Sequence, residues 1–124
     1  MPTTDARRRV LFVEDEVALH GAYRRYFQQR HDLAFAGTGA QALEEFAAFR
    51  PDVVVIDLHL PDTDGIEVLN QMRQTRPGLA IVITSGYASM LPVVEVLGIA
   101  HSGYLMKPFE LDTLRACIDA APAP

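Results

Sequence analysis

The feature that most constrains the fold is a fivefold alternation of short apolar runs with segments that carry apolar residues at helical spacing. The runs are RVLFV, LAFAG, VVVI, LAIVI and GYLM, at residues 9–13, 33–37, 53–56, 79–83 and 103–106. Short apolar runs bounded by turn residues are typical of strands that are buried in a sheet. The sequence therefore predicts five strands.

A helix is expected after each strand. The apolar positions that define four of these helices are Leu19, Tyr23, Tyr26 and Phe27; Leu43, Phe46 and Ala47; Ile66, Leu69 and Met72; and Leu111, Leu114 and Ile118. The fourth helix in order, VVEVLG at 93–98, is expected to start late and to be short, because Pro92 suits a first helical turn and Gly98 suits a helix end. Pro51 is expected to stop the second helix.

Five βα units in succession indicate an α/β fold in which helices cover both faces of a parallel sheet. The doubly wound strand order 2-1-3-4-5, the flavodoxin-like arrangement, is the topology that we expect for five strands. A length of 124 residues fits one domain. We assign residues 1–124 to it, with residues 1–7 and 121–124 as tails.

Composition excludes several functions. A net charge of −5 argues against nucleic-acid binding, and we interpret Arg7-Arg8-Arg9 as a solvated lead-in to the first strand rather than a binding patch. The single Cys117 excludes an internal disulfide and suits a reducing compartment, so we expect a cytoplasmic location. No apolar run approaches the ~20 residues that span a bilayer, and the N-terminus lacks the apolar stretch of a signal peptide.

Acidic residues follow two strands that this topology makes neighbours. Glu14-Asp15-Glu16 ends the first strand and Asp57 ends the third, beside the switch point where open α/β sheets bind ligands. Carboxylates this close repel by about 4 kcal/mol per pair, so some take up protons or a cation lies among them, and Mg²⁺ accepts such ligands. A lone acid here is more often a helix N-cap, a role open to Asp15 or Glu16. Acids at both strand ends favour a site.

Two further strand ends bring polar groups to the same edge. Thr84-Ser85-Gly86 ends the fourth strand and Lys107-Pro108 ends the fifth. Alone, Thr84 would be interpreted as a turn residue and Lys107 as a solvated one. Together with the acids, they provide the nucleophile, metal ligands, hydroxyl and positive charge that phosphorylation of a carboxylate requires.

With these residues in place, the chain resembles the receiver domain of two-component response regulators. The resemblance covers residues 8 to 120 and depends on four motifs in order: VLFVEDE, VIDLHLPDTDG, VITSG and YLMKPF. The TSGY segment is also similar to receivers attached to hybrid histidine kinases. The resemblance is to a signalling domain that accepts a phosphoryl group and is not a turnover enzyme.

The resemblance implies a role for each residue of the site. Asp57 would accept a phosphoryl group from the phosphohistidine of a histidine kinase or a histidine phosphotransfer protein. Glu14, Asp15 and Asp57, with the backbone carbonyl of His59, would hold Mg²⁺. Lys107 would contact the phosphoryl group. Glu14 departs from the family, in which an aspartate is commoner at this position, and we expect metal binding to survive the change.

The resemblance also implies how the signal leaves the site. Thr84 would contact the phosphoryl group after phosphorylation, Tyr104 would turn inward as the switch residue, and the 84–91 loop would move. The peptide bond before Pro108 would be cis. The surface formed by the fourth helix, fifth strand and fifth helix would bind a downstream protein, and a homodimer through this surface is possible.

Several features have two interpretations from sequence. The His59 side chain either tunes loss of the phosphoryl group or has no role, and Tyr87 could share the switch role. The apolar segment 90–97 either packs onto the sheet or forms a partner or dimer surface. His20, His31 and His101 are interpreted as surface residues.

Two other functions compete with the receiver. One is a docking module that is never phosphorylated. The other is a phosphatase with an aspartyl nucleophile, which is disfavoured because its usual second aspartate is replaced here by His59. Sequence does not decide between a stand-alone receiver and a piece of a longer chain.

Overall fold

A computed structural model describes residues 7–86 and 90–121, and strands and helices alternate throughout them. The strands are β1 (Arg9–Val13), β2 (Asp32–Ala36), β3 (Val53–Asp57), β4 (Ala80–Ser85) and β5 (Gly103–Met106). The helices are α1 (Val17–Phe27), α2 (Gly39–Phe49), α3 (Gly65–Thr75), α4 (Met90–Val96) and α5 (Leu111–Ala120). All strands are parallel, in the order β2-β1-β3-β4-β5, which confirms the expected doubly wound topology.

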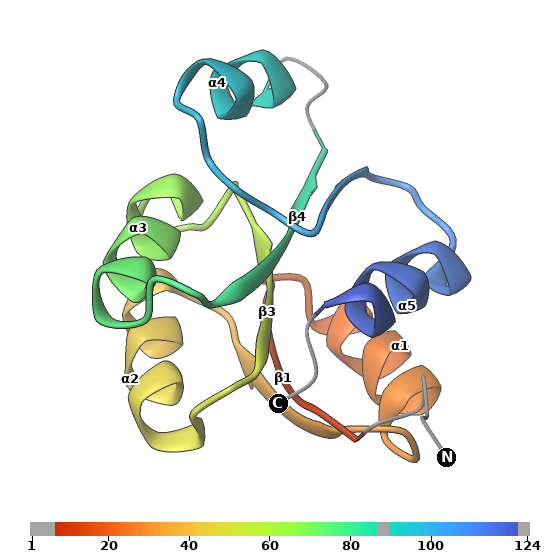
Figure 1. Cartoon of the computed structure of the whole chain (residues 1–124). Helices are drawn as coiled ribbons and strands as arrows, with labels where there is room; N and C mark the ends of the chain where they lie inside the picture. Colours follow the sequence, from red (N-terminus) through yellow and green to blue (C-terminus); the bar gives the residue numbers. More distant parts are fainter. Residues whose placement is uncertain (1–6, 87–89, 122–124) are drawn as a thin grey trace.

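The sheet is covered on both faces. Helices α1 and α5 lie together on one side, and α2 and α3 lie on the other, with α4 beyond them (Figure 1). Every residue of β3 and β4 is buried. This is the burial that central strands of a parallel sheet require, and it explains why these two strands read as uninterrupted apolar runs.

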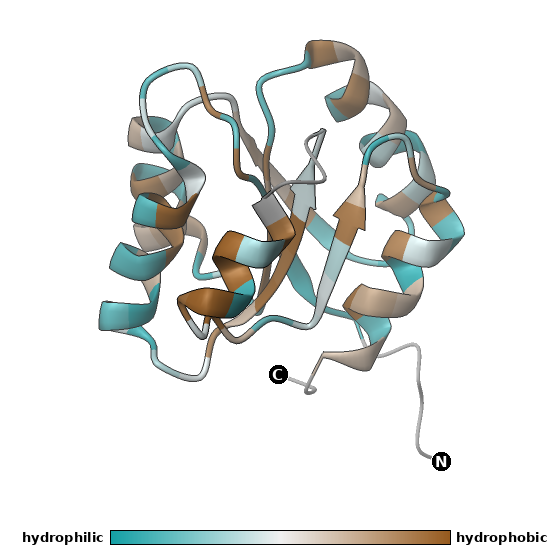
Figure 2. Ribbon diagram, turned by 90° about the horizontal axis from the view of Figure 1, so that it is seen from above, coloured by the Kyte–Doolittle hydropathy of each residue, from teal (hydrophilic) through white to brown (hydrophobic). Residues whose placement is uncertain are grey.

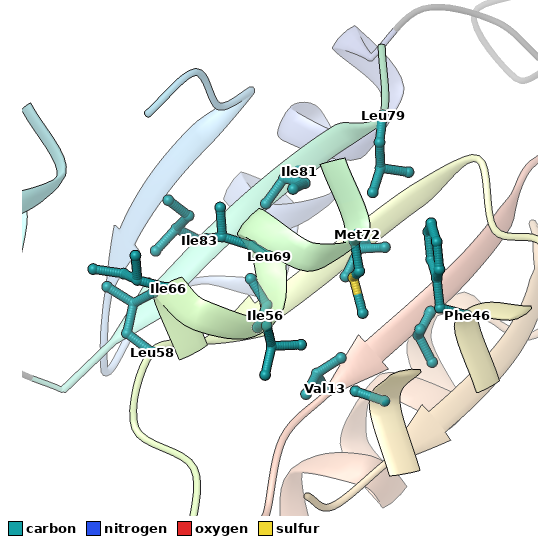
Figure 3. Close-up of a cluster of buried hydrophobic side chains, with 14 of the residues drawn as sticks. Val13, Phe46, Ile56, Leu58, Ile66, Leu69, Met72, Leu79, Ile81 and Ile83 are labelled. Atoms are coloured by element: carbon teal, nitrogen blue, oxygen red, sulfur yellow. The ribbon is translucent and has the colours of Figure 1, made fainter. Parts of the chain in front are cut away.

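Two hydrophobic clusters fill the space between the sheet and its helices. On one face, Ile56 and Ile81 pack with Leu69 and Met72 of α3 and with Phe46 of α2 (Figure 3). The cluster on the other face packs aromatic rings closely, and the ring centres of Phe12 and Tyr23 are 4.7 Å apart. The two clusters hold the strands rigidly on both sides, so the groups at the strand ends are well fixed.

The strand boundaries differ slightly from those expected. The first and fifth match, and the second lies one residue earlier. Strands β3 and β4 continue to Asp57 and Ser85 because their backbone pairing continues: Asp57 pairs with Thr84 in the ladder. Polar side chains do not end a strand when their backbone groups still find partners.

The helix ends follow local chemistry. The Asp64 side chain accepts a hydrogen bond from the Ile66 N–H at 2.9 Å and so caps α3, as its position in the sequence allows. Glu16 is the N-cap residue of α1, but its side chain makes no capping bond. The short α4 begins at Met90, three residues before the expected start at residue 93, and ends at Val96 rather than at 98. The earlier start is possible because Pro92 then lies in the first helical turn, where its missing N–H costs no helical hydrogen bond. Gly98, two residues after α4, adopts a positive φ of 65°, as suits a residue that follows a helix. The Lys107–Pro108 peptide bond is cis, as expected.

The interpretations of Arg8 as solvated and of His31 as a surface residue are wrong. Arg8 is only 4% exposed, and its guanidinium donates to the carbonyls of Asp119 and Ala121 at 3.2 and 2.9 Å. His31 is 2% exposed, and its Nδ1 accepts the Arg8 N–H at 3.1 Å. Ala121, which we placed in a tail, is also buried. The end of α5 folds back against the start of β1, a contact between residues over a hundred positions apart.

Within the part of the chain that the structure describes, no helix has the length and apolar character needed to cross a membrane. Helix α4 is nevertheless largely hydrophobic along its length (Figure 2).

Candidate functional site

The parallel register brings the strand ends together. Val13 pairs with Ile56, so Glu14 follows β1 at the level at which Asp57 ends β3. Asp57 in turn pairs with Thr84 of β4, and Ser85 pairs with Met106, directly before Lys107. Residues predicted to meet at one edge of the sheet therefore do meet there.

Lys107 lies at the centre of this edge. Its Nζ is 2.7 Å from Asp57 Oδ2, 2.7 Å from Glu14 Oε1 and 3.5 Å from Glu16 Oε1. The Asp57 and Glu14 side chains are almost completely buried, whereas Lys107 keeps some exposure. A single ammonium group therefore neutralises part of the charge of carboxylates from two strands.

Three carboxylates form a compact cluster. Glu14, Asp15 and Asp57 each offer an oxygen, and these oxygens lie within 4.8 Å of one another. Asp15 is exposed and the other two are buried, so the cluster is open to solvent on one side. A set of oxygen donors with one open side fits Mg²⁺, which binds through one or two carboxylates and keeps several waters.

The electrostatics of the cluster are shaped by burial. Burial raises the pKa of Glu14 above its ordinary value, although hydrogen bonds from Lys107 and from the Glu16 N–H act in the opposite direction. Burial alone would lower the pKa of Lys107, but the carboxylates of Asp57 and Glu14 together outweigh it, so the pKa is raised. Lys107 therefore stays charged beside Asp57 throughout the physiological range.

The backbone around Asp57 fixes the orientation of its carboxylate. The His59 N–H donates to Asp57 Oδ1 at 2.8 Å, while Oδ2 faces Lys107. The loop then closes tightly: the Gly65 N–H donates to the Leu58 carbonyl at 2.9 Å. A Cβ atom at Gly65 would lie 2.6 Å from the Asp57 carbonyl oxygen, so only glycine allows this approach.

The two expected switch residues lie beside the site on the strands that end there. Thr84 is 1% exposed and sits opposite Asp57 in the ladder. Tyr104 of β5 is half-buried, packs against the core on the α3 side, and meets the ring of His101 edge-on. Their roles, and that of the His59 carbonyl, stay predictions. Tyr87 lies outside the described residues.

Sequence inspection missed several groups that border the site. Glu16 approaches Lys107, the His20 ring contacts the Glu14 carbonyl, and Tyr23 buries a hydroxyl without a hydrogen-bond partner among the described residues. Burial, with the charge of Glu14, raises the pKa of Tyr23. The sequence assigns Tyr23 to core packing and predicts a surface position for His20. The two lie one helical turn apart after the acids, and this shared face was the signal that could have found them.

The structure shows that the apolar segment 90–97 is partly packed onto the sheet and partly exposed. Val94 is buried against the sheet. Val96 and Leu97 are 85% and 58% exposed, and Val93 is also exposed. Val94 therefore anchors the segment to the core, while Val93, Val96 and Leu97 give it an apolar outer face.

A flavodoxin-like domain with clustered carboxylates and a lysine at its switch point is the arrangement of a signalling receiver domain. The model of the response regulator receiver domain family matches residues 10–119, and the chain belongs to this family. It is a receiver domain of the two-component type, a signalling domain whose relatives work with histidine kinases and output domains.

Known proteins support this assignment. The chain is 33% identical to the regulatory protein LuxO of Vibrio cholerae over 88% of its own length and 24% of the relative. It is 36% identical to the response regulator MprA of Mycobacterium leprae, over 90% of its own length and 50% of the relative. The chain thus spans a quarter to a half of these curated relatives.

Solved structures are similar in fold and sequence. A sensor protein from Polaromonas sp. JS666 superposes with a TM-score of 0.83 at 28% identity, covering 93% of this chain and 95% of that one. A CheY-like receiver domain from Methanospirillum hungatei gives 0.82 at 26% identity, covering 91% of each chain.

Proposed function

We propose that Asp57 accepts a phosphoryl group and that phosphorylation changes the surface formed by α4, β5 and α5. The observation that carries this proposal is the position of Lys107, whose Nζ lies 2.7 Å from Asp57 Oδ2 and at the same distance from Glu14 Oε1. A cation placed between a buried carboxylate and an acidic cluster can stay beside Asp57 at rest and contact a phosphoryl oxygen afterwards.

The reaction is a transfer between two nucleophiles. A carboxylate oxygen of Asp57 attacks phosphorus, the P–N bond of the donor phosphohistidine breaks, and the imidazole leaves with the bonding electrons. The His59 N–H holds Oδ1, which leaves Oδ2 facing Lys107 as the attacking oxygen. The nucleophile is therefore positioned before the donor arrives.

Mg²⁺ is the cofactor that the acidic cluster fits. Glu14, Asp15 and Asp57 would hold it, with the His59 backbone carbonyl as a further ligand. When bound, it would supply positive charge to the oxygens of the transferring group. Glu14 has the longer side chain, yet its oxygen lies within the same cluster as those of both aspartates, which supports binding despite the departure from aspartate.

Phosphorylation would act by shifting a population between two states. The new phosphoryl oxygens would recruit the Thr84 hydroxyl and the Lys107 ammonium, and Tyr104 would turn inward toward the space that Thr84 vacates. The outer surface next to this rearrangement includes exposed Val93, Val96 and Met106. A downstream protein, or a second copy of the chain, would bind there in one state better than in the other.

The partners follow from the chemistry. The donor is a histidine kinase or a histidine phosphotransfer protein, and the recipient of the signal is a protein rather than nucleic acid. The chain either acts alone or as the receiver part of a longer protein, such as a response regulator or a hybrid histidine kinase. It is not a turnover enzyme.

The test is phosphorylation by a small acyl-phosphate donor with Mg²⁺, followed by intact-mass measurement. We expect an adduct of about 80 Da that requires Mg²⁺ and is absent from Asp57→Asn. An adduct that persists in this variant would place the acceptor elsewhere. A folded wild-type protein that forms no adduct would favour a docking module, and continuous release of phosphate from an ester would favour a phosphatase.

A further inference from the structure

A second candidate binding surface lies between α2 and α3. The structure contains a groove of about 730 Å³ there, lined chiefly by Leu43, Phe46, Arg50, Met72, Thr75 and Arg76, which we call the α2–α3 groove. In a βα unit the helix runs antiparallel to the strand, so the C-terminal ends of α2 and α3 point away from the carboxyl end of β3 (Figure 1). Asp57 is the last residue of β3. The groove is therefore separate from the phosphorylation site.

The floor of the α2–α3 groove is apolar. Phe46 of α2 and Met72 of α3 lie next to each other beneath it (Figure 3). Leu43, one turn before Phe46, is only partly buried and extends the apolar floor along α2. A floor of this kind suits apolar side chains.

Two arginines stand at one end of the groove, and each is the C-cap residue of its helix: Arg50 for α2 and Arg76 for α3. The guanidinium carbon of Arg76 lies 5.6 Å from the centre of the Phe46 ring. Within the described part of the chain neither guanidinium forms an ion pair, and none of the residues that line the groove is acidic. In a chain of net charge −5, this is a local positive site.

Arg50 occupies a backbone conformation that favours another residue. Its φ of 54° and ψ of 63° are left-handed, and a helix ends in this conformation most often with glycine. A positive charge at the C-terminal end of a helix interacts favourably with the helix dipole, and this holds for Arg50 and Arg76 alike. Glycine would make the turn before Pro51 with less strain, but it would supply no side chain to the groove, whereas arginine supplies a charged one.

We propose that the α2–α3 groove binds a short amphipathic helix of a partner protein whose first turn is acidic. The groove side of α2 runs from Leu43 to Arg50, which is two helical turns or about 10 Å. Apolar side chains one turn apart would pack over Phe46 and Met72, and carboxylates would pair with Arg50 and Arg76. This is the helix-in-groove mode of recognition, with charge fixing the direction of the bound helix.

The test uses amide NMR spectra of the whole chain during titration with a synthetic peptide of about twelve residues. The peptide carries leucines at helical spacing and two glutamates in its first turn. We expect saturable shifts in residues 43–50 and 71–76, and binding that is weakened roughly three- to tenfold when the glutamates are replaced by glutamine. The double variant Arg50→Gln, Arg76→Gln should weaken binding by a similar factor.

The control is Arg25→Gln, which removes the same type of charge from the exposed side of α1 and should leave the affinity unchanged. The proposal is wrong if the glutamine peptide binds equally well, if the double variant binds like the wild type, or if shifts lie elsewhere. Shifts at the groove that appear on concentrating the protein alone would assign it to a second copy instead. If decanoate bound as tightly as the glutamate peptide, the α2–α3 groove would be a site for a small apolar carboxylate instead.

Discussion

Lys107 Nζ lies 2.7 Å from Asp57 Oδ2, an ion pair that joins the ends of two strands separated by β4. Because the same nitrogen is 2.7 Å from Glu14 Oε1, the lysine holds the acidic cluster together before any metal or phosphoryl group arrives. The ammonium group of Lys107 therefore offsets part of the negative charge of Asp57 and Glu14.

Replacing Lys107 with alanine should strengthen Mg²⁺ binding. The substitution removes the positive charge closest to the cluster, so the affinity should rise on the order of tenfold. Calorimetric titration with Mg²⁺ measures the change. Lys107→Arg keeps the charge and should bind Mg²⁺ like the wild type. Equal affinity in the alanine variant would show that Mg²⁺ binds away from the lysine.

Glu14→Gln should stabilise the metal-free protein at neutral pH. Burial raises the pKa of Glu14 above its ordinary value of 4.5. The protonated form of this side chain therefore adds to the free energy of unfolding below pH 4.5, and this contribution is lost as the pH rises through the pKa of the folded protein. Glutamine stays neutral and avoids this loss. Urea unfolding without Mg²⁺ should show a higher midpoint for the variant at pH 7, and the advantage should shrink toward pH 4. A variant that is less stable at both pH values would contradict the prediction.

His31→Asn should reduce the acid sensitivity of the fold. Burial lowers the pKa of His31, so its contribution to stability is present above the ordinary value of 6.5 and is lost as the pH falls below it. The asparagine oxygen can take the place of Nδ1 in accepting the Arg8 N–H but does not titrate. Urea unfolding between pH 7 and 5 should show a smaller stability loss in this variant. His101→Asn, at an exposed site, should behave like the wild type.

Arg8→Ala should destabilise the domain by about 3 kcal/mol, because it leaves the carbonyls of Asp119 and Ala121 without their charged donor in a buried position. Hydrogen exchange at the end of α5 should accelerate, since that end is held by Arg8. The matched control is Arg7→Ala, whose ion pair with Asp32 is exposed and is worth less than about 1 kcal/mol. Equal losses in the two variants would contradict the prediction.

Gly65→Ala should impair both stability and phosphorylation. The added methyl group would lie 2.6 Å from the Asp57 carbonyl oxygen and 2.7 Å from Leu58 Cα, so the end of β3 must shift. We expect a loss of about 1–3 kcal/mol on urea unfolding and a slower mass gain with the acyl-phosphate donor. Gly78→Ala makes the same chemical change where nothing lies within 4 Å, and it should change neither measurement.

Local patterns in the sequence were sufficient to predict the order of the elements and to place each strand within one or two residues. Periodicity alone distinguishes the uninterrupted apolar run of 53–56 from the helical spacing of Ile66, Leu69 and Met72. Once a parallel sheet is inferred, its geometry brings residues after neighbouring strands to one edge, and Glu14, Asp57 and Lys107 were placed together in this way.

The errors occurred where a side chain depends on a distant partner. Arg8 and His31 look like surface residues beside other polar residues, and Tyr23 looks like an ordinary core residue. The burial of Arg8 and His31 follows from contacts with the end of α5. The Tyr23 hydroxyl has no hydrogen-bond partner among the described residues. Burial raises its pKa, and the hydroxyl is close enough to the acidic cluster for the charge of Glu14 to raise that pKa further. No local spacing encodes the contacts of Arg8 and His31 with α5, because the partners lie about ninety to over a hundred positions away in the sequence.

The sequence by itself therefore determined the α/β class, the strand order and the residues that meet at the site. Hydrophobic periodicity identifies each strand and helix from a few neighbouring residues, and the succession of βα units then implies a parallel sheet with a known strand order. Only the tertiary structure decided which charges are buried, which carboxylates share Lys107, and where α2 and α3 leave a groove. Those outcomes depend on solvent exclusion and on distances between elements, which arise only when the helices pack against the sheet.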